Sequence, residues 1–207
     1  STLLTQVRQA WLDTPLAALA RPDVRVNLYP DSGTSRVAEF TFDWPEETTL
    51  LSARSTELES AALGLLQELG APPEGLTVDA LLTALKGRVE VDPEGGSTAG
   101  DALVEGRADS QGLVLALRLL CQLADLDTTV VEGRLDGAAR FWLIVSTGEG
   151  YRHLDPAAEE PAYATDAVFQ ELGYEWSAER YPDCTDYAAA GADAALAQET
   201  AEISPAA

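Results

Sequence analysis

The sequence predicts an α+β fold in which a central buried helix packs on an antiparallel sheet, after an N-terminal helix and a β-hairpin. Two observations lead to this prediction. The segment 110–125 is apolar nearly all round, which is typical of a helix enclosed by a core. Strand-like runs follow at 128–134, 141–147 and 150–155, and a turn over 147–150 joins the last two as a hairpin.

The first half of the chain adds separate periodic segments. Apolar residues recur at helical spacing over 3–20, and Arg21-Pro22 ends this predicted helix. Alternating runs at 24–29 and 37–42 predict the two strands of the hairpin, joined by a longer loop. Further expected elements are a helix over 55–70 capped by Ser55 or Thr56, a short helix from Thr77 to Gly87, and a turn at 92–96.

These segments predict one main domain with additions at both ends. Residues 1–50 form an accessory of helix and hairpin, and residues 51–187 form the main domain. Residues 188–207 are an acidic, alanine-rich tail, which we expect to be a frayed helix or disordered.

The charge balance excludes several classes of partner. The chain carries 35 acidic and 13 basic residues, a net charge of −22. Binding to a phosphate backbone or an anionic membrane surface depends on lysine and arginine, so nucleic acid is a poor partner. No stretch reaches the roughly 20 apolar residues of a membrane helix, so we expect no direct membrane insertion.

Cofactor and metal chemistry has little support in the composition. Cys121 and Cys184 are the only cysteines and His153 is the only histidine, which excludes a zinc-finger pattern and a disulfide framework. No calcium-binding loop is visible, because the acidic residues near the C-terminus are too widely spaced: Asp183, Asp186 and Asp193. We therefore expect no cofactor and no metal.

Several segments resemble one known family. The stretch 99–113 is similar to the "A-Y-G-A-L-V-x-G-x-A-V-C-x-G-Y-A" segment of bacterial transglutaminase-like proteins. The resemblance continues at 131–133 ("V-x-G"), at 140–142 ("H-A-W"), at 151–156 ("W-Y-H-x-D-P/T") and at 173–184. It covers roughly residues 97–184 and implies a papain-like core, in which a nucleophile stands at the N-terminus of the buried helix.

The resemblance also locates a catalytic triad of Cys, His and Asp, and this sequence departs from it at two positions. Ser110 stands at the cysteine position, Arg140 at the histidine position, and Asp155 remains. A serine hydroxyl needs a positioned base to react, and arginine stays protonated. We expect Arg140 and Asp155 to form an ion pair that fills the site and removes its base.

Other residues offer alternatives. His153 and Asp155 are two positions apart, so on a strand they share a face, and His153 is either a base or a hydrogen-bonded strand residue. Cys121 is interpreted as a buried structural thiol, and Ser110 either caps its helix or binds a ligand. Trp142, Trp176 and Tyr181 either form the walls of a binding cleft or pack in the core.

The sequence therefore predicts a catalytically inactive transglutaminase-like domain that binds a peptide or protein segment in a relic cleft. One alternative is a hydrolase or acyl transferase of altered chemistry with Ser110 as nucleophile. Another is a structural module whose cleft the Arg140–Asp155 pair closes.

We also expect an extracellular or cell-surface location. The chain begins at Ser1 and contains no methionine, which we interpret as processing of a signal peptide or lipoprotein leader. The acidic composition and the resemblance to exported bacterial proteins favour the same location.

Overall fold

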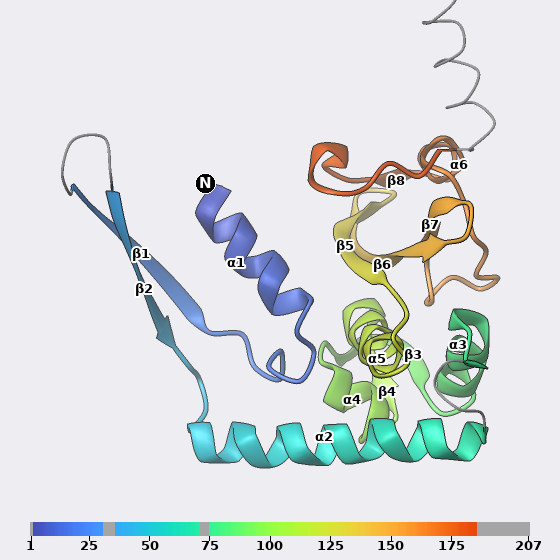
Figure 1. Ribbon diagram of the computed structural model, residues 1–207, viewed down its shortest axis with the longest axis horizontal. Helices are drawn as coiled ribbons and strands as arrows, with labels where there is room; N and C mark the ends of the chain where they lie inside the picture. Colours follow the sequence, from blue (N-terminus) through green and yellow to red (C-terminus); the bar gives the residue numbers. More distant parts are fainter. Residues whose placement is uncertain (1, 31–35, 71–74, 186–207) are drawn as a thin grey trace, which may run out of the picture. The chain divides into compact units, whose positions relative to one another are not determined.

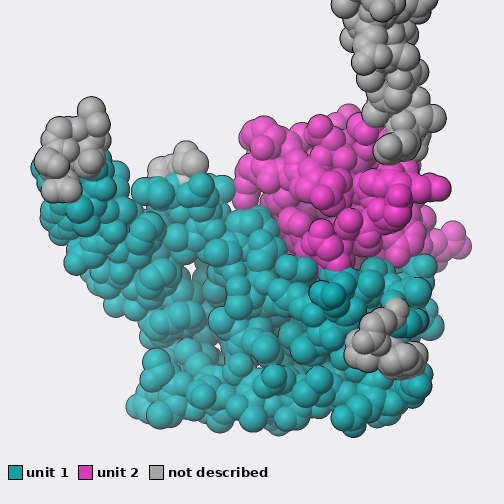
Figure 2. Space-filling model, in the orientation of Figure 1, with its two compact units in different colours: residues 1–126 teal, residues 127–207 magenta. Residues whose placement is uncertain are grey.

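The computed structural model describes residues 2–30, 36–70 and 75–185, and it confirms an α+β architecture with helices and antiparallel sheets (Figure 1). The chain divides into two compact units, residues 1–126 and 127–207, which Figure 2 shows in different colours. This boundary falls inside the predicted domain 51–187, and each unit is described by itself. The predicted tail 188–207 lies outside the described residues.

The first unit contains most of the helices. Its elements are α1 (Thr2–Leu12), β1 (Asp23–Pro30), β2 (Arg36–Asp43), α2 (Thr48–Leu69), α3 (Val78–Lys86), β3 (Glu90–Gly96), α4 (Ala99–Leu103), β4 (Arg107–Ala108) and α5 (Ser110–Leu123). The second unit contains β5 (Thr128–Leu135), β6 (Ala138–Thr147), β7 (Gly150–Leu154), α6 (Asp166–Glu171), β8 (Tyr174–Glu175) and the 3₁₀ helix η2 (Ala178–Arg180).

Helix α5 is the buried helix that the sequence predicts. Asp109 caps its N-terminus, accepting a hydrogen bond from the Gly112 amide. The helix contacts α2, α3, α4 and β3 within its own unit. Nine of its residues are buried, including Leu113 and Cys121, so apolar side chains on every face are accommodated. The sequence also predicts that this helix packs on an antiparallel sheet. Because α5 belongs to the first unit and the four-stranded sheet to the second, that contact stays a prediction.

The predicted hairpin is also confirmed, as an antiparallel pair of β1 and β2 in register from Asp23↔Asp43 to Pro30↔Arg36. Its connecting residues 31–35 lie outside the described part. One face of the ribbon is largely polar, with Tyr29 and Val37 at one end, and Arg25 pairs with Asp43 across the strands at 2.6 Å. The opposite face carries apolar side chains. Val24 and Val26 are half-buried, whereas Leu28, Ala38, Phe40 and Phe42 are exposed.

Three local predictions were wrong at their boundaries. The first helix ends at Leu12 instead of 20, because Pro15 disfavours helical geometry at the residue before it. Helix α2 begins at Thr48 without a side-chain cap, so Ser55 and Thr56 lie inside it. Residues 92–96, expected to form a turn, belong to β3, which pairs in parallel with β4 across an irregular register.

The second unit is built on one antiparallel sheet with strand order β7-β6-β5-β8. Two tight turns join its central strands. Asp136 and Gly137, between β5 and β6, both have positive φ (52° and 81°), as a two-residue hairpin turn of the primed type requires. The predicted turn between β6 and β7 is confirmed, with Thr147 opposite Gly150. The core on one side of the sheet centres on Trp142 and Phe169.

Helices that could cross a membrane are absent from the part of the chain that the structure describes.

Gly112 offers a test of how tightly α5 is packed at its start. A Cβ there would lie 2.7 Å from the Gly96 carbonyl oxygen and 2.9 Å from the Thr98 oxygen, both backbone atoms. We expect Gly112→Ala to lower the free energy of unfolding by about 1–3 kcal/mol, because a closely packed backbone must move. The matched control is Gly64→Ala in α2, where no atom lies within 4 Å. It should raise stability by up to about 1 kcal/mol through helix propensity. Urea titration measures both, and equal effects would contradict the packing argument.

Candidate functional site

The predicted ion pair between Arg140 and Asp155 is present in the second unit. Arg140 lies on β6, and Asp155 directly follows β7, its antiparallel neighbour. The Arg140 Nε donates to Asp155 Oδ2 at 2.7 Å. The Asp155 side chain is only 2% exposed, whereas the Arg140 side chain is 22% exposed. A buried carboxylate of this kind depends on its partners to offset the loss of water.

Two further donors complete the surroundings of Asp155. The Tyr174 hydroxyl donates to Oδ2 at 2.7 Å, and the Ala157 amide donates to Oδ1 at 2.8 Å. Burial, followed by the hydrogen bond to Asp155, raises the pKa of Tyr174 well above its ordinary range, so its hydroxyl stays protonated as a donor. Three donors from three segments thus hold both oxygens of this carboxylate.

The pair has a direct chemical consequence. A guanidinium remains protonated at any physiological pH, so Arg140 cannot accept a proton from a nucleophile. Asp155, whose two oxygens are already engaged, has no imidazole to orient. The residues that stand at the histidine and aspartate positions of the resemblance therefore form a closed hydrogen-bonded group without a base.

His153 belongs to a second, separate network on the same sheet. Its side chain is fully buried, and the Trp142 Nε1–H donates to its Nδ1 at 2.9 Å. Because an indole nitrogen can only donate, Nδ1 must carry the lone pair and Nε2 the proton. Nε2 then donates to Asp166 Oδ1 at 2.7 Å. His153 is thus a hydrogen-bonded strand histidine, one of the two interpretations that the sequence left open.

The surroundings keep this imidazole neutral. Burial lowers the pKa of His153 below its ordinary value of 6.5, although the hydrogen bond and the charge of Asp166 act in the opposite direction. The ring also stacks on Phe169, with centroids 4.6 Å apart. Protonation of Nδ1 would place two donors face to face, because Trp142 has no acceptor to offer.

Cys184 completes a group of possible metal ligands with His153 and Asp166. One ligand atom from each residue lies within 4.8 Å of the others. The hydrogen bonds do not fit a metal, however. A metal on Nε2 would require a proton on Nδ1, where the Trp142 N–H already donates. Burial, followed by the charge of Asp166, also raises the pKa of Cys184 to about 12, which disfavours the thiolate that a metal needs. The group is better described as a hydrogen-bonded network.

Ser110 is the first residue of α5, and it is half-buried. The interpretation of Ser110 as the helix cap was wrong, because the preceding Asp109 takes that role. The Asp109 Oδ1 accepts a hydrogen bond from the Gly112 amide at 2.8 Å, and the Asp109 Oδ2 accepts one from the Ser97 hydroxyl at 2.5 Å. Ser110 belongs to the first unit, whereas Arg140 and Asp155 belong to the second. The convergence of these three residues therefore stays a prediction.

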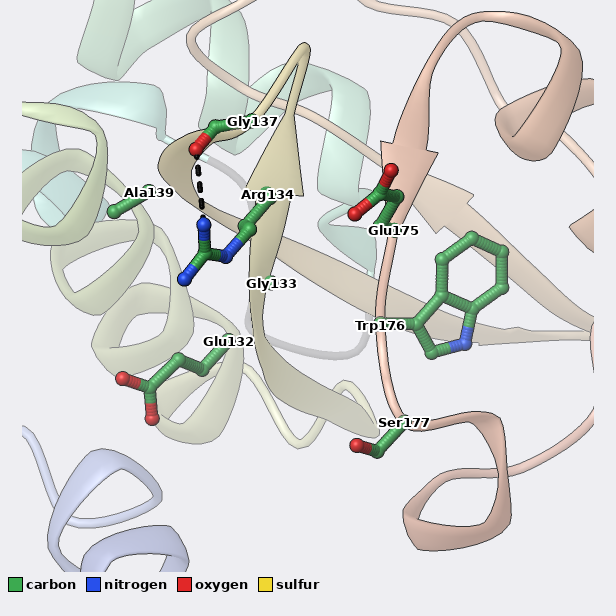
Figure 3. Close-up of a pocket in the computed structure, with 8 residues that line it drawn as sticks. All are labelled: Glu132, Gly133, Arg134, Gly137, Ala139, Glu175, Trp176 and Ser177. Carbon is green, nitrogen blue, oxygen red and sulfur yellow. Dashed lines mark hydrogen bonds between the residues drawn. The ribbon is translucent and has the colours of Figure 1, made fainter.

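The three aromatic residues expected at a cleft have different environments. Trp142 is fully buried at the centre of the core, and Tyr181 is buried beside it. Trp176 is half-buried and lines a pocket of about 540 Å³ on the second unit (Figure 3). Trp176 is thus the one of the three that lines this pocket. The remaining lining residues come from β5, the turn after it, β6, β8 and the segment after β8: Glu132, Gly133, Arg134, Gly137, Ala139, Glu175 and Ser177.

Both cysteines are buried, and neither forms a disulfide with the other. Cys121 has no exposed surface on α5, which confirms the interpretation of this residue as a buried thiol. Sequence reasoning missed Tyr174 and Asp166, the partners of Asp155 and His153. Asp166 follows Thr165, which caps α6, so the cap was a visible signal for the helix but not for the contact with His153.

Comparisons with known proteins identify no family. No protein-family model matches the chain, and no curated protein matches it. Among solved structures, a chain described as "Crystal structure of a TGase" aligns with 72% of this chain and 48% of its own length, at 10% identity and a TM-score of 0.42. This chain thus spans about half the length of that structure. So distant a likeness hints at a transglutaminase-like fold and carries no argument about papain-like details or activity.

The Arg140–Asp155 contact can be tested by a double-mutant cycle. Arg140→Met leaves a buried carboxylate without its cation, and we expect a loss of about 2–4 kcal/mol in the free energy of unfolding. Arg140→Met combined with Asp155→Asn should be less destabilised than the sum of the single variants, by roughly 1–3 kcal/mol.

The matched control for this cycle is Arg25→Met, which breaks an ion pair whose side chains are 68% and 57% exposed. An exposed pair contributes about 1 kcal/mol or less, so this variant should hardly change. Urea titration followed by tryptophan fluorescence measures all variants. An additive cycle, or equal losses at Arg25 and Arg140, would contradict the role assigned to the buried pair.

His153 generates a prediction for pH. Its folded pKa is lowered, so below pH 6.5 the unfolded chain binds more protons than the folded one. The stability that the neutral ring contributes is fully present above pH 6.5, and it should be lost as the pH falls from 6.5 toward the folded pKa. His153→Gln should reduce the slope of stability against pH in this window by at most one proton.

Because the chain has a single histidine, ¹⁵N-resolved NMR of the imidazole provides a direct readout. We expect the neutral Nε2–H form at pH 6, where an exposed histidine would be mostly charged. A charged ring or the Nδ1–H form at this pH would overturn the assignment of the Trp142–His153–Asp166 network.

Proposed function

We propose that this chain is a non-catalytic, transglutaminase-like domain that binds a peptide or protein segment. The observation that carries the proposal is the closed group around Asp155. Arg140, Tyr174 and the Ala157 amide hold its carboxylate, so a permanently protonated guanidinium stands beside this acid in the place of a base.

The absence of a suitable base supports the loss of acyl transfer. Activation of a serine or cysteine nucleophile requires a group that accepts its proton within hydrogen-bond reach. Arg140 stands where the resemblance expects that group, and it cannot accept a proton. His153, the one histidine of the chain, is buried with both ring nitrogens engaged. Neither residue can serve as the general base of a Ser110 nucleophile in this arrangement.

The pocket beside Trp176 supports a binding role. Charged and hydroxyl side chains line it, namely Glu132, Arg134, Glu175 and Ser177, and such groups can hydrogen-bond another molecule. Its residues lie on the sheet and on the segment after β8, both part of one compact unit. Such a site does not need the chemistry that the Arg140–Asp155 pair removes.

We further propose that the domain acts outside the cell or at a bacterial cell surface. The net charge of −22 and the resemblance to exported proteins support this location. Fractionation of the source cells, followed by antibody detection of the chain, would test it.

A fluorophosphonate probe separates this proposal from a serine-based enzyme. We expect the native protein to incorporate no more probe than the Ser110→Ala variant, because neither Arg140 nor His153 can accept the serine proton. Hydrolysis of a p-nitrophenyl ester should likewise be equal for both proteins. Labelling of the native protein that disappears in Ser110→Ala would show an active nucleophile and would refute the non-catalytic assignment.

A further inference from the structure

We infer that the apolar face of the β1–β2 ribbon is a dimer interface, on which the same face of a second copy of this chain packs. The ribbon belongs to the first unit, so this inference goes beyond the proposed binding function, which is argued from the second unit. The apolar face consists of the side chains that share one side of the two paired strands: Val24, Val26, Leu28, Ala38, Phe40 and Phe42.

The apolar face is incompletely covered within one copy of the chain. The ribbon is a sheet of two strands, and a sheet of this size is marginally stable in water unless its hydrophobic face is packed. Leu28 is 59% exposed, Phe40 is 37% exposed and Phe42 is 44% exposed. With about 200 Å² for each of these residues, the three together leave roughly 300 Å² of apolar surface in contact with solvent.

This area is sufficient for a dimer of modest strength. Two copies would bury roughly 600 Å² from these three residues, whereas specific interfaces bury about 1,200–2,000 Å² in total, of which roughly 60% is apolar. Ala38 is also exposed, and Trp44, which closely follows β2, is 38% exposed, so both add apolar area. The sum reaches the lower part of the range, and we expect a dissociation constant of about 1–100 μM.

The position of the charged residues allows a second copy to approach this face. A net charge of −22 makes two copies repel each other at most parts of their surface. Side chains alternate along a strand, however, and the carboxylates of the ribbon all fall on the opposite, polar face: Asp23, Glu39 and Asp43. Packing of one apolar face on another therefore brings no carboxylate of the ribbon into the contact.

The apolar face is also complementary to itself. Its cross-strand pairs are Val24↔Phe42, Val26↔Phe40 and Leu28↔Ala38, so each pair combines a larger and a smaller side chain. A two-fold axis parallel to the strands places β1 of one copy over β2 of the other, at the same height along the ribbon. Each larger side chain then faces a smaller one, which is the arrangement that lets two layers interdigitate. No partner of different sequence is needed.

Sedimentation of the full chain tests the inference. The mass should rise from 22.0 kDa toward twice that value as the concentration increases between about 1 and 300 μM. Added salt should favour the dimer, because it screens the repulsion between the two acidic copies and leaves the apolar contact in place. A dimer that salt dissociates would indicate an interface of ion pairs and would overturn the assignment.

A matched pair of variants locates the interface. Leu28→Glu places a carboxylate on the apolar face of both copies, and we expect it to weaken dimerisation by at least about tenfold. Val37→Glu adds the same charge at a residue that is 52% exposed and lies on the polar face, opposite Tyr29. Its dissociation constant should stay within about twofold of the native value, because the added charge lies outside the contact. Circular dichroism checks that both variants are folded.

Three outcomes would overturn the inference. A mass of 22.0 kDa at every concentration and salt level would show that the apolar face does not bind a second copy. A dimer that Leu28→Glu leaves intact would lie at another surface. Equal losses in Leu28→Glu and Val37→Glu would mean that the added charge acts through general repulsion, without a contact at the apolar face.

Discussion

The arrangement of the second unit depends on one buried carboxylate. Asp155 is withdrawn from water at the end of β7, and a strand residue, a tyrosine from β8 and a backbone amide meet around it. Burial of an isolated charge is costly, so these three segments are held together wherever the chain is folded. Because the cation in this group is a guanidinium, the contact that organises the sheet edge also excludes proton transfer at the same position. The stability of this group and the lack of a proton acceptor at Arg140 thus share one origin.

The sequence predicted the elements whose signal is local. Helix α5 was visible because its apolar residues continue around the helix, and the β1–β2 hairpin because polar and apolar residues alternate. The errors arose where a single residue decides a boundary. Pro15 ends α1 early, and α2 begins at Thr48 without the side-chain cap by which such starts are usually located.

The candidate site was predictable only in part. The Arg140–Asp155 pair followed from two positions of a resemblance together with charge complementarity. Tyr174 and Asp166 could not be found in this way, because their contacts arise from how the chain after β7 folds back onto the sheet. Trp142, conspicuous as an aromatic residue, proved to be core, where its indole N–H determines the tautomer of His153. A pattern of residue types does not tell which side of a strand faces the core.

The β1–β2 ribbon has a consequence for local dynamics. Two strands alone bury little, and the aromatic side chains on the apolar face of this ribbon stay partly in contact with solvent, Phe40 at 37% and Phe42 at 44% exposure. Opening of the ribbon therefore costs less free energy than opening of α5, whose side chains are enclosed. Its amide protons should exchange with solvent while those of α5 are still retained, so the ribbon opens more readily than α5.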